Sequence, residues 1–318
     1  MARRRHVPRN SDARGRTRRP PSRLDGHVAV VAGATRGAGR GIAVELGAAG
    51  AIVYCTGRSV RGGPAVSGRP ETIEETAELV TAGGGAGIPV RVDHTVPREV
   101  GRLFDRIRHE QHGRLDLLVN DVWGGDALAE WGTPFWQVSL EKGLLLLKRA
   151  VDSHFITGRP GVPLMIDRGR GLFIEVTDGT SATYRGNLTY DLAKASVIRL
   201  AYGMARDLRG TEVTALALSP GFLRSEAVLD HFGVTEATWR VAIPKDPYFA
   251  GSETPRYIGR AVVALATDPG IARKAGKAFG TWDLAPEFGF VDIDGARPHW
   301  ARFYREARRA RRGPTQSS

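Results

Sequence analysis

Tyr190 and Lys194 are the two residues whose types and spacing most directly indicate chemistry. They lie four positions apart in the segment TYDLAKAS, and on a helix this spacing places both side chains on one face. A lysine ammonium next to a phenol favours the phenolate, so we expect Lys194 to lower the pKa of Tyr190 toward neutrality. Such a phenol can exchange a proton with a carbonyl or alcohol oxygen. The alternative is a helix that carries an unrelated, exposed Tyr and Lys.

A glycine-rich turn near the start of the chain indicates phosphate binding. The segment AGATRGAGRG contains Gly33, Thr35, Gly37 and Gly39, with an apolar run before it and a helical pattern after it. Glycines allow a sharp turn and close approach to a pyrophosphate, which the amides of the following helix attract. We therefore predict a dinucleotide site; the alternative is a turn that is only structural.

The residues after the second apolar run indicate which dinucleotide binds. An NAD site would place a carboxylate there to hold the ribose 2′-hydroxyl, but the chain reads YCTGR and ends on Arg58. Arg58 and Arg36 are suited to a 2′-phosphate. NADP (NADPH) is thus predicted over NAD, unless both arginines are merely solvated.

The elements that must position these residues alternate between apolar runs and helical periods. This alternation predicts an α/β, doubly wound Rossmann fold with a seven-stranded, mostly parallel sheet and helices on both faces. Thr72 and Glu75 form a capping box, residues 136–155 are predicted to be helical, and residues 60–70 and 157–171 are predicted to be surface loops. The expected strands cover residues 28–32, 51–55, 88–92, 115–119, 172–176, 213–218 and 277–282.

Charge and composition narrow the class of protein. Of the net charge of +12, residues 1–23 contribute +8 and residues 302–312 contribute +5, which leaves about −1 for the rest. We therefore expect a disordered basic tail over 1–23, a single domain over 24–300 and a basic C-terminal tail over 301–318, with no specific nucleic-acid partner. No apolar run is long enough to span a membrane, and one Cys fits a reducing compartment. The sequence predicts a cytoplasmic protein without a membrane partner, and it indicates no metal site.

These residues, in this order, resemble the short-chain dehydrogenase/reductase family over about residues 24–290. Its T-G-x-x-x-G-x-G motif matches except that Ala32 replaces the Thr, and its Y-x-x-x-K motif matches Tyr190 and Lys194. The NDVWGG segment, Gly143 and the long C-terminal part resemble a subgroup around dehydrogenase/reductase SDR family member 1. The resemblance implies that Lys194 also binds the nicotinamide ribose and adds cofactor contacts from Asp93, Asn120, Pro220, Gly221 and Ser225.

Two positions depart from the family pattern. The place of the catalytic Ser, thirteen residues before the Tyr, is taken by Thr177, with Asp178 as the alternative occupant. A carboxylate there would be a poor donor to the substrate oxygen unless it were protonated. The helix Asn that holds a proton-relay water in the family aligns with Gly143.

The resemblance implies an NADP(H)-dependent oxidoreductase that transfers a hydride between the nicotinamide and a small carbonyl or alcohol substrate. In this interpretation Tyr190 exchanges a proton with the substrate oxygen, and Lys194 adjusts the pKa of Tyr190. Thr177 donates a hydrogen bond to the substrate oxygen. Residues 222–240 fall where the family carries its substrate lid. A homo-oligomer, dimer or tetramer, is implied through the helices that start near Phe135 and Tyr190. The alternative is a cofactor-binding, redox-responsive regulator or scaffold with little catalytic activity.

Overall fold

The protein is built on a seven-stranded parallel sheet. The computed structural model describes residues 23–63, 68–181 and 183–312, so nearly all of the predicted N-terminal tail lies outside the described residues. All neighbouring strands pair in parallel in the order β3-β2-β1-β4-β5-β6-β7. This confirms the predicted fold class. The strands are β1 (Val28–Ala32), β2 (Ile52–Gly57), β3 (Ala86–Arg91), β4 (Leu117–Asn120), β5 (Gly171–Val176), β6 (Val213–Ser219) and β7 (Ala278–Gly280).

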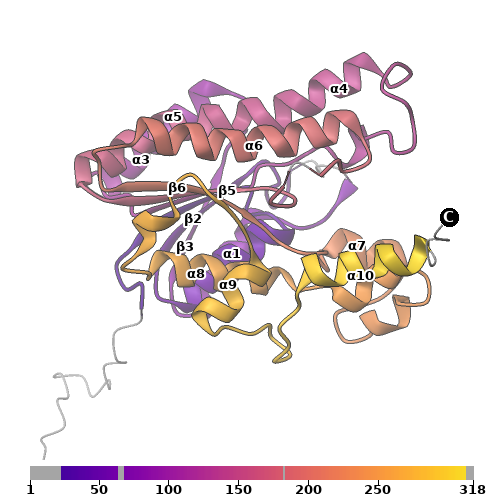
Figure 1. The fold of residues 1–318 in the computed structure, drawn as a ribbon. Helices are drawn as coiled ribbons and strands as arrows, with labels where there is room; N and C mark the ends of the chain where they lie inside the picture. Colours follow the sequence, from indigo (N-terminus) through magenta and orange to yellow (C-terminus); the bar gives the residue numbers. More distant parts are fainter. Residues whose placement is uncertain (1–22, 64–67, 182, 313–318) are drawn as a thin grey trace, which may run out of the picture.

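Helices cover both faces of the sheet, as Figure 1 shows. Side chains alternate along β1, so Ala29 and Val31 pack into one apolar core while Val28 and Val30 pack into the other. The first core is covered by α1 (Gly37–Ala48), α2 (Ile73–Ala82), α8 (Pro255–Ala266) and α9 (Thr281–Phe288); the opposite face carries α3 (Pro97–Glu110), α4 (Leu140–Leu147), α5 (Ser153–Arg168) and α6 (Leu188–Asp207). No helix of the described residues is long and apolar enough to cross a membrane.

The start of α2 confirms the predicted capping box. The Thr72 hydroxyl accepts a hydrogen bond from the Glu75 amide at 3.3 Å, and the Glu75 carboxylate accepts one from the Thr72 amide at 3.2 Å. The box satisfies two amides that have no partner within the helix. The first turn of α2 also contacts the turn that follows β1, because the Thr76 hydroxyl donates to the Thr35 carbonyl at 3.5 Å.

The prediction that residues 157–171 form a surface loop is wrong. The helical segment continues from α4 through a π-helical stretch (Lys148–Asp152) into α5, which ends only at Arg168 and contains two prolines. The buried side of α5 carries Thr157, Gly158, Gly161, Leu164 and Met165, a helical spacing made largely of small residues. Close packing on the sheet thus outweighs the helix-breaking tendency of Gly and Pro. Residues 60–63 and 68–70 form no regular element except the start of a turn, as predicted.

Replacing Gly161 with Ala should destabilise the protein by about 1–3 kcal/mol, because the added methyl group would overpack this contact. A Cβ on Gly161 would lie 2.8 Å from Leu118 Cδ2 and 2.9 Å from Phe104 Cε1. Urea unfolding measures the loss. Gly101→Ala on α3 is the matched control, since a Cβ there meets nothing within 4 Å; equal unfolding free energies for the two variants would contradict the packing argument.

The C-terminal region is also more ordered than predicted. Residues from 301 onward were expected to form a basic tail, but α10 (Trp300–Arg312) is a helix that contacts the 3₁₀ segment Pro247–Gly251, and Figure 1 labels it near α7 (Glu226–Phe232). The Trp300 ring lies 5.9 Å from that of Phe222 and 5.6 Å from that of Tyr248. These aromatic contacts anchor the arginine-rich segment to the region expected to form the substrate lid, whereas residues 313–318 lie outside the described residues.

Candidate active site

Tyr190 and Lys194 lie in the first two turns of α6, as their spacing predicted. The Asn187 side chain caps this helix by accepting a hydrogen bond from the Tyr190 amide at 3.0 Å. The Tyr190 hydroxyl donates to Asp178 Oδ2 at 2.8 Å. The rings of Trp131 and Trp123 lie 5.0 and 5.4 Å from the Tyr190 ring. The partly buried phenol therefore packs against two aromatic rings and is oriented by one carboxylate.

The prediction that Lys194 lowers the pKa of Tyr190 is wrong. Burial raises the pKa of Tyr190 well above its ordinary value, and the charge of Asp178 raises it further. Lys194 Nζ lies 4.0 Å from the centre of the Trp123 ring and 5.6 Å from that of the Tyr190 ring, within the range of cation–π contacts. Burial lowers the pKa of Lys194, opposed by Asp178 and Asp121. Tyr190 is thus a protonated acid at neutral pH.

Asp178, not Thr177, contacts the Tyr190 phenol. The Thr177 hydroxyl donates to the carbonyl oxygen of Lys194 at 2.8 Å, and Thr177 is only 3% exposed. Thr177 therefore supports the turn of α6 that carries Lys194. Gly143 lies where α4 packs on α6: a Cβ there would be 3.0 Å from Thr189 Cγ2.

The turn between β1 and α1 has the geometry of a dinucleotide cradle. Gly33 has φ +88°, and a Cβ on it would lie 2.3 Å from the carbonyl oxygen of Asp121. A Cβ on Gly39 would lie 2.2 Å from the Gly33 carbonyl oxygen. The residue before the helix, Arg36, provides no side-chain cap for α1. The residues present therefore fit a pyrophosphate, because only glycines allow this turn and the Arg36 side chain does not cap the start of the helix.

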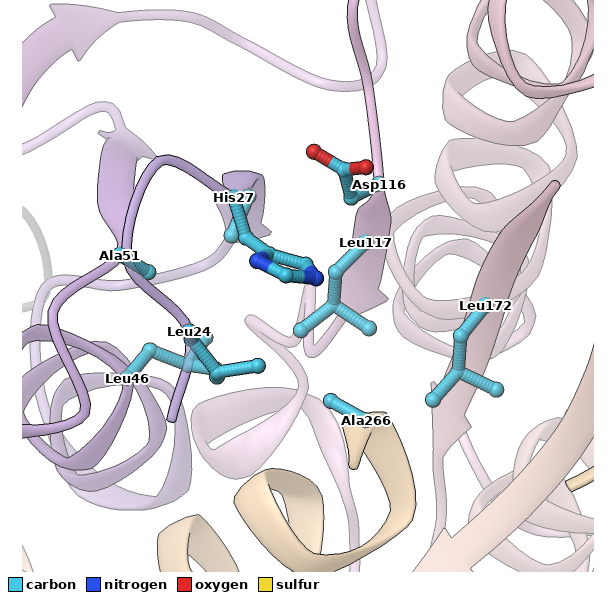
Figure 2. Close-up of a pocket in the computed structure, with 9 residues that line it drawn as sticks. Leu24, His27, Leu46, Ala51, Asp116, Leu117, Leu172 and Ala266 are labelled. Carbon is cyan, nitrogen blue, oxygen red and sulfur yellow. The ribbon is translucent and has the colours of Figure 1, made fainter. Parts of the chain in front are cut away.

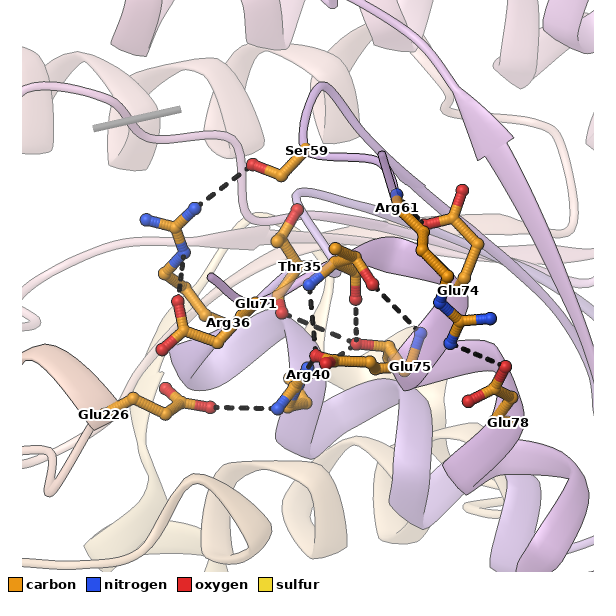
Figure 3. Close-up of polar contacts among 12 residues, drawn as sticks. Thr35, Arg36, Arg40, Ser59, Arg61, Glu71, Glu74, Glu75, Glu78 and Glu226 are labelled. Carbon is orange, nitrogen blue, oxygen red and sulfur yellow. Dashed lines mark hydrogen bonds and ion pairs between the residues drawn. The ribbon is translucent and has the colours of Figure 1, made fainter. Parts of the chain in front are cut away.

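A carboxylate from the lid region reaches the start of α1. The Gly37 amide donates to Glu226 Oε2 at 2.8 Å, and Arg40 Nη1 lies 3.8 Å from Glu226 Oε1. Figure 3 shows Glu226 approaching Arg40 from the side opposite α2. Glu226 is the first residue of α7, directly after the Ser225 cap.

The two arginines expected to bind a 2′-phosphate both lie close to β2. Arg36 Nη2 donates to the Ser59 hydroxyl at 3.2 Å, and its Nε lies 3.6 Å from a Glu71 carboxylate oxygen (Figure 3). Arg58 Nη1 lies 3.8 Å from Asp93 Oδ2. Burial alone would raise the pKa of Asp93, but hydrogen bonds from Thr95 and the charge of Arg58 lower it overall.

The remaining predicted cofactor residues border the same edge of the sheet. Asn120 ends β4 and donates to the His154 carbonyl at 3.1 Å. Pro220 and Gly221 follow β6, with the Pro220 carbonyl accepting from the Ser219 hydroxyl at 2.8 Å. Ser225 caps α7 and its Cβ lies 3.8 Å from the position of a Cβ on Gly37. Parallel strands bring their carboxyl ends together, so β1, β2, β4 and β6 all contribute to one site.

Sequence reasoning did not assign four residues of this site. Asp121 approaches the glycine turn, where burial raises its pKa to about 7 and Lys194 opposes the rise. Trp131 contacts Tyr190 from a distant loop, and Glu226 contacts Gly37 from the start of α7. The two ring nitrogens of His154 form hydrogen bonds with the Glu175 carboxylate and with the Val122 carbonyl in the loop after β4. Asp121 could have been found from the sequence, because a carboxylate directly follows Asn120. The contacts of Trp131 and Glu226 join distant parts of the chain, so no local pattern indicates them.

A small cavity at the opposite end of the sheet is not a second site. It has a volume of about 30 Å³, and Figure 2 shows His27 and Asp116 beside it, just before β1 and β4. This volume is about that of one water molecule. The Nδ1 atom of His27 is buried without a hydrogen-bond partner among the described residues, which suits a single water. No cluster of metal-ligating side chains occurs within the described part of the chain.

A doubly wound parallel sheet with a glycine turn and a Tyr–Lys pair at its carboxyl edge defines a nucleotide-binding Rossmann-type oxidoreductase. The model of the short chain dehydrogenase family matches residues 27–231, and the chain belongs to this family. It is 36% identical over 281 residues to the mouse (Mus musculus) dehydrogenase/reductase SDR family member 1, covering 86% of this chain and 85% of that protein. The human protein of the same name is 34% identical, with the same coverage. The resemblance to this subgroup is thereby confirmed.

Solved structures show the same fold. A short chain dehydrogenase from Mycobacterium thermoresistibile superposes with a TM-score of 0.70 at 23% identity, over 85% of this chain and 90% of that chain. A gluconate 5-dehydrogenase homologue from Beutenbergia cavernae, described with bound NADP, superposes with a TM-score of 0.64 at 22% identity, over 82% and 97% of the two chains. At these identities the agreement concerns the architecture alone.

Proposed function

We propose that this protein is an NADP(H)-dependent oxidoreductase that transfers a hydride between the nicotinamide and a carbonyl or alcohol substrate. The observation that carries the proposal is the hydrogen bond from the Tyr190 hydroxyl to Asp178 at 2.8 Å, made by a helix that also carries the partly buried Lys194. Asp121 connects this pair to the glycine turn, because its carboxylate oxygen lies 2.9 Å from a Cβ on Gly39 and its charge acts on Lys194.

The protein residues supply binding, orientation and the proton. A bound nicotinamide supplies or accepts the hydride. In the reducing direction, Tyr190 donates its hydroxyl proton to the substrate oxygen, which takes the place of Asp178 as its hydrogen-bond acceptor. Lys194 lies beside this site with its ammonium over the Trp123 ring, and Trp123 and Trp131 pack against the Tyr190 ring. Thr177 acts indirectly, because its hydroxyl donates to the carbonyl oxygen of Lys194 and so supports that turn of α6. Asp178 takes the position next to the Tyr190 hydroxyl that the sequence assigned to Thr177.

Several features support NADP as the cofactor. Arg36 and Arg58 both lie at the carboxyl end of β2, and a guanidinium pairs well with a 2′-phosphate. Gly33, Thr35, Gly37 and Gly39 would hold the pyrophosphate, with Asp93 and Asn120 near the adenine and nicotinamide sides. Among the relatives, an Arabidopsis thaliana protein named NADPH-dependent aldehyde reductase 2 is 29% identical over 222 residues.

A titration and a substrate screen test this proposal together. We expect the purified protein to bind NADPH at least about tenfold more tightly than NADH, because the arginines gain a phosphate partner. A panel of aldehydes and ketones should then cause loss of NADPH absorbance with at least one compound class. Tighter binding of NADH would contradict the cofactor assignment. Binding without turnover across a broad panel would favour a regulator or scaffold.

We also propose assembly into a homo-oligomer, dimer or tetramer, through the helices expected near Phe135 and Tyr190, which are α4 and α6. Leu140 and Leu144 on α4 are 75% and 58% exposed, and Leu192 on α6 is 49% exposed. Trp136, at 72% exposed, precedes α4. Large exposed apolar side chains on two helices that contact each other indicate a protein interface. A cytoplasmic location stays a prediction.

A further inference from the structure

The contact between Glu226 and α1 couples the lid region to the cradle. Glu226 begins α7, and its carboxylate accepts the hydrogen bond of the Gly37 amide at 2.8 Å. Arg40 Nη1 lies 3.8 Å from the other Glu226 oxygen, while Arg40 Nη2 is held by Glu75 at 2.7 Å. A carboxylate therefore has the position and the charge that an anion would take at this helix start (Figure 3).

We infer that Glu226 is an internal competitor for the phosphate-binding start of α1 and thereby sets the cofactor affinity of this chain. This inference rests on the proposed dinucleotide site. The Gly37 amide has one hydrogen to donate, so Glu226 and a pyrophosphate oxygen cannot both accept it. The negative charges of the Glu226 carboxylate and of a pyrophosphate at the same amide would also repel each other. Cofactor binding therefore requires Glu226 to leave Gly37.

The competition has a consequence for the lid. When Glu226 leaves, α7 loses its hydrogen bond to α1 but keeps the ion pair between Asp230 and Arg69 at 2.7 Å. Because the apparent affinity of a ligand falls with the fraction of protein in the competent state, the Glu226 contact weakens dinucleotide binding. By linkage, a bound dinucleotide weakens the contact of α7 with α1 to the same extent.

Neutralising Glu226 should strengthen cofactor binding. We expect Glu226→Gln and Glu226→Ala to bind NADPH about three- to thirtyfold more tightly than the unchanged protein, as measured by isothermal titration calorimetry. Two variants are used because Gln keeps the size of the side chain and Ala removes its reach. Thermal unfolding of each variant confirms that it is folded before the titration.

Two control variants separate competition from net charge and from lid attachment. Glu287→Gln on α9 removes the same charge at the Lys274 pair, and Asp230→Asn removes the other tether of α7. Neither should change NADPH affinity by more than about twofold. Unchanged or weaker NADPH binding by both Glu226 variants, or an equal gain in Glu287→Gln, overturns the inference while leaving the proposed function intact. If neither the unchanged protein nor any variant binds NADPH or NADH, the proposed function itself fails, and the inference fails with it.

Discussion

Replacing Tyr190 with Phe should lower turnover by about 10²–10⁴-fold, the usual contribution of a positioned acid. The phenylalanine ring keeps the contacts with Trp123 and Trp131 but has no proton to donate and leaves Asp178 without its donor. NADPH affinity should change by less than about twofold, because no cradle contact involves the hydroxyl. Steady-state rates with an active carbonyl compound, together with calorimetric NADPH titration, measure both effects.

The matched control for this variant is Tyr202→Phe. Tyr202 lies on the same helix, is 39% exposed and contacts Arg199 rather than the site. It should leave turnover within about twofold, as for an ordinary surface substitution. Undiminished activity in Tyr190→Phe would show that another group donates the proton, whereas parallel losses of activity and NADPH affinity would point to a structural role for the ring.

The parts of the fold that depend on local patterns could be predicted from the sequence. Continuous apolar runs such as residues 28–32 correspond to buried strands, since a parallel sheet covered on both faces needs apolar side chains at every position. The Thr72–Glu75 capping box follows from hydrogen bonds within four residues. The spacing of Tyr190 and Lys194 also gives their shared face of α6, because helical geometry is independent of what surrounds it.

The errors arose where tertiary contacts decide. Gly161 and Pro160 lower helix propensity, but Gly161 is the residue that lets α5 approach Phe104 and Leu118, which only the fold brings near it. Likewise, the pKa of Tyr190 depends on Asp178 and on its burial by distant tryptophans, not on Lys194 alone. The contact between Gly37 and Glu226 joins residues 189 positions apart. Nothing in the local sequence of either residue indicates it.

Asp178→Asn should shift the pH dependence of both reaction directions to lower pH. Burial keeps the pKa of Tyr190 raised in the variant, but the carboxylate that raises it further is removed. Reduction requires the protonated phenol and should therefore fail at a lower alkaline pH than in the unchanged protein. Oxidation requires the phenolate and should begin at a lower pH. The kcat/KM of each direction, taken relative to its own plateau, should therefore change at a lower pH, whereas the ratio of the two directions at any one pH stays fixed by the equilibrium constant of the reaction.

The same substitution acts on Lys194 in the same direction, because the charge of Asp178 also holds up the pKa of that ammonium. Loss of the ammonium charge disfavours the phenolate, so the titration of Lys194 opposes the fall of the Tyr190 pKa in the variant. Profiles of kcat/KM from pH 6 to pH 11 in both directions measure the shift, and Asp207→Asn at the far, exposed end of α6 controls for the loss of one negative charge. A profile that moves to higher pH, or that coincides with the Asp207 control, would mean that Asp178 does not govern the protonation of Tyr190 during catalysis.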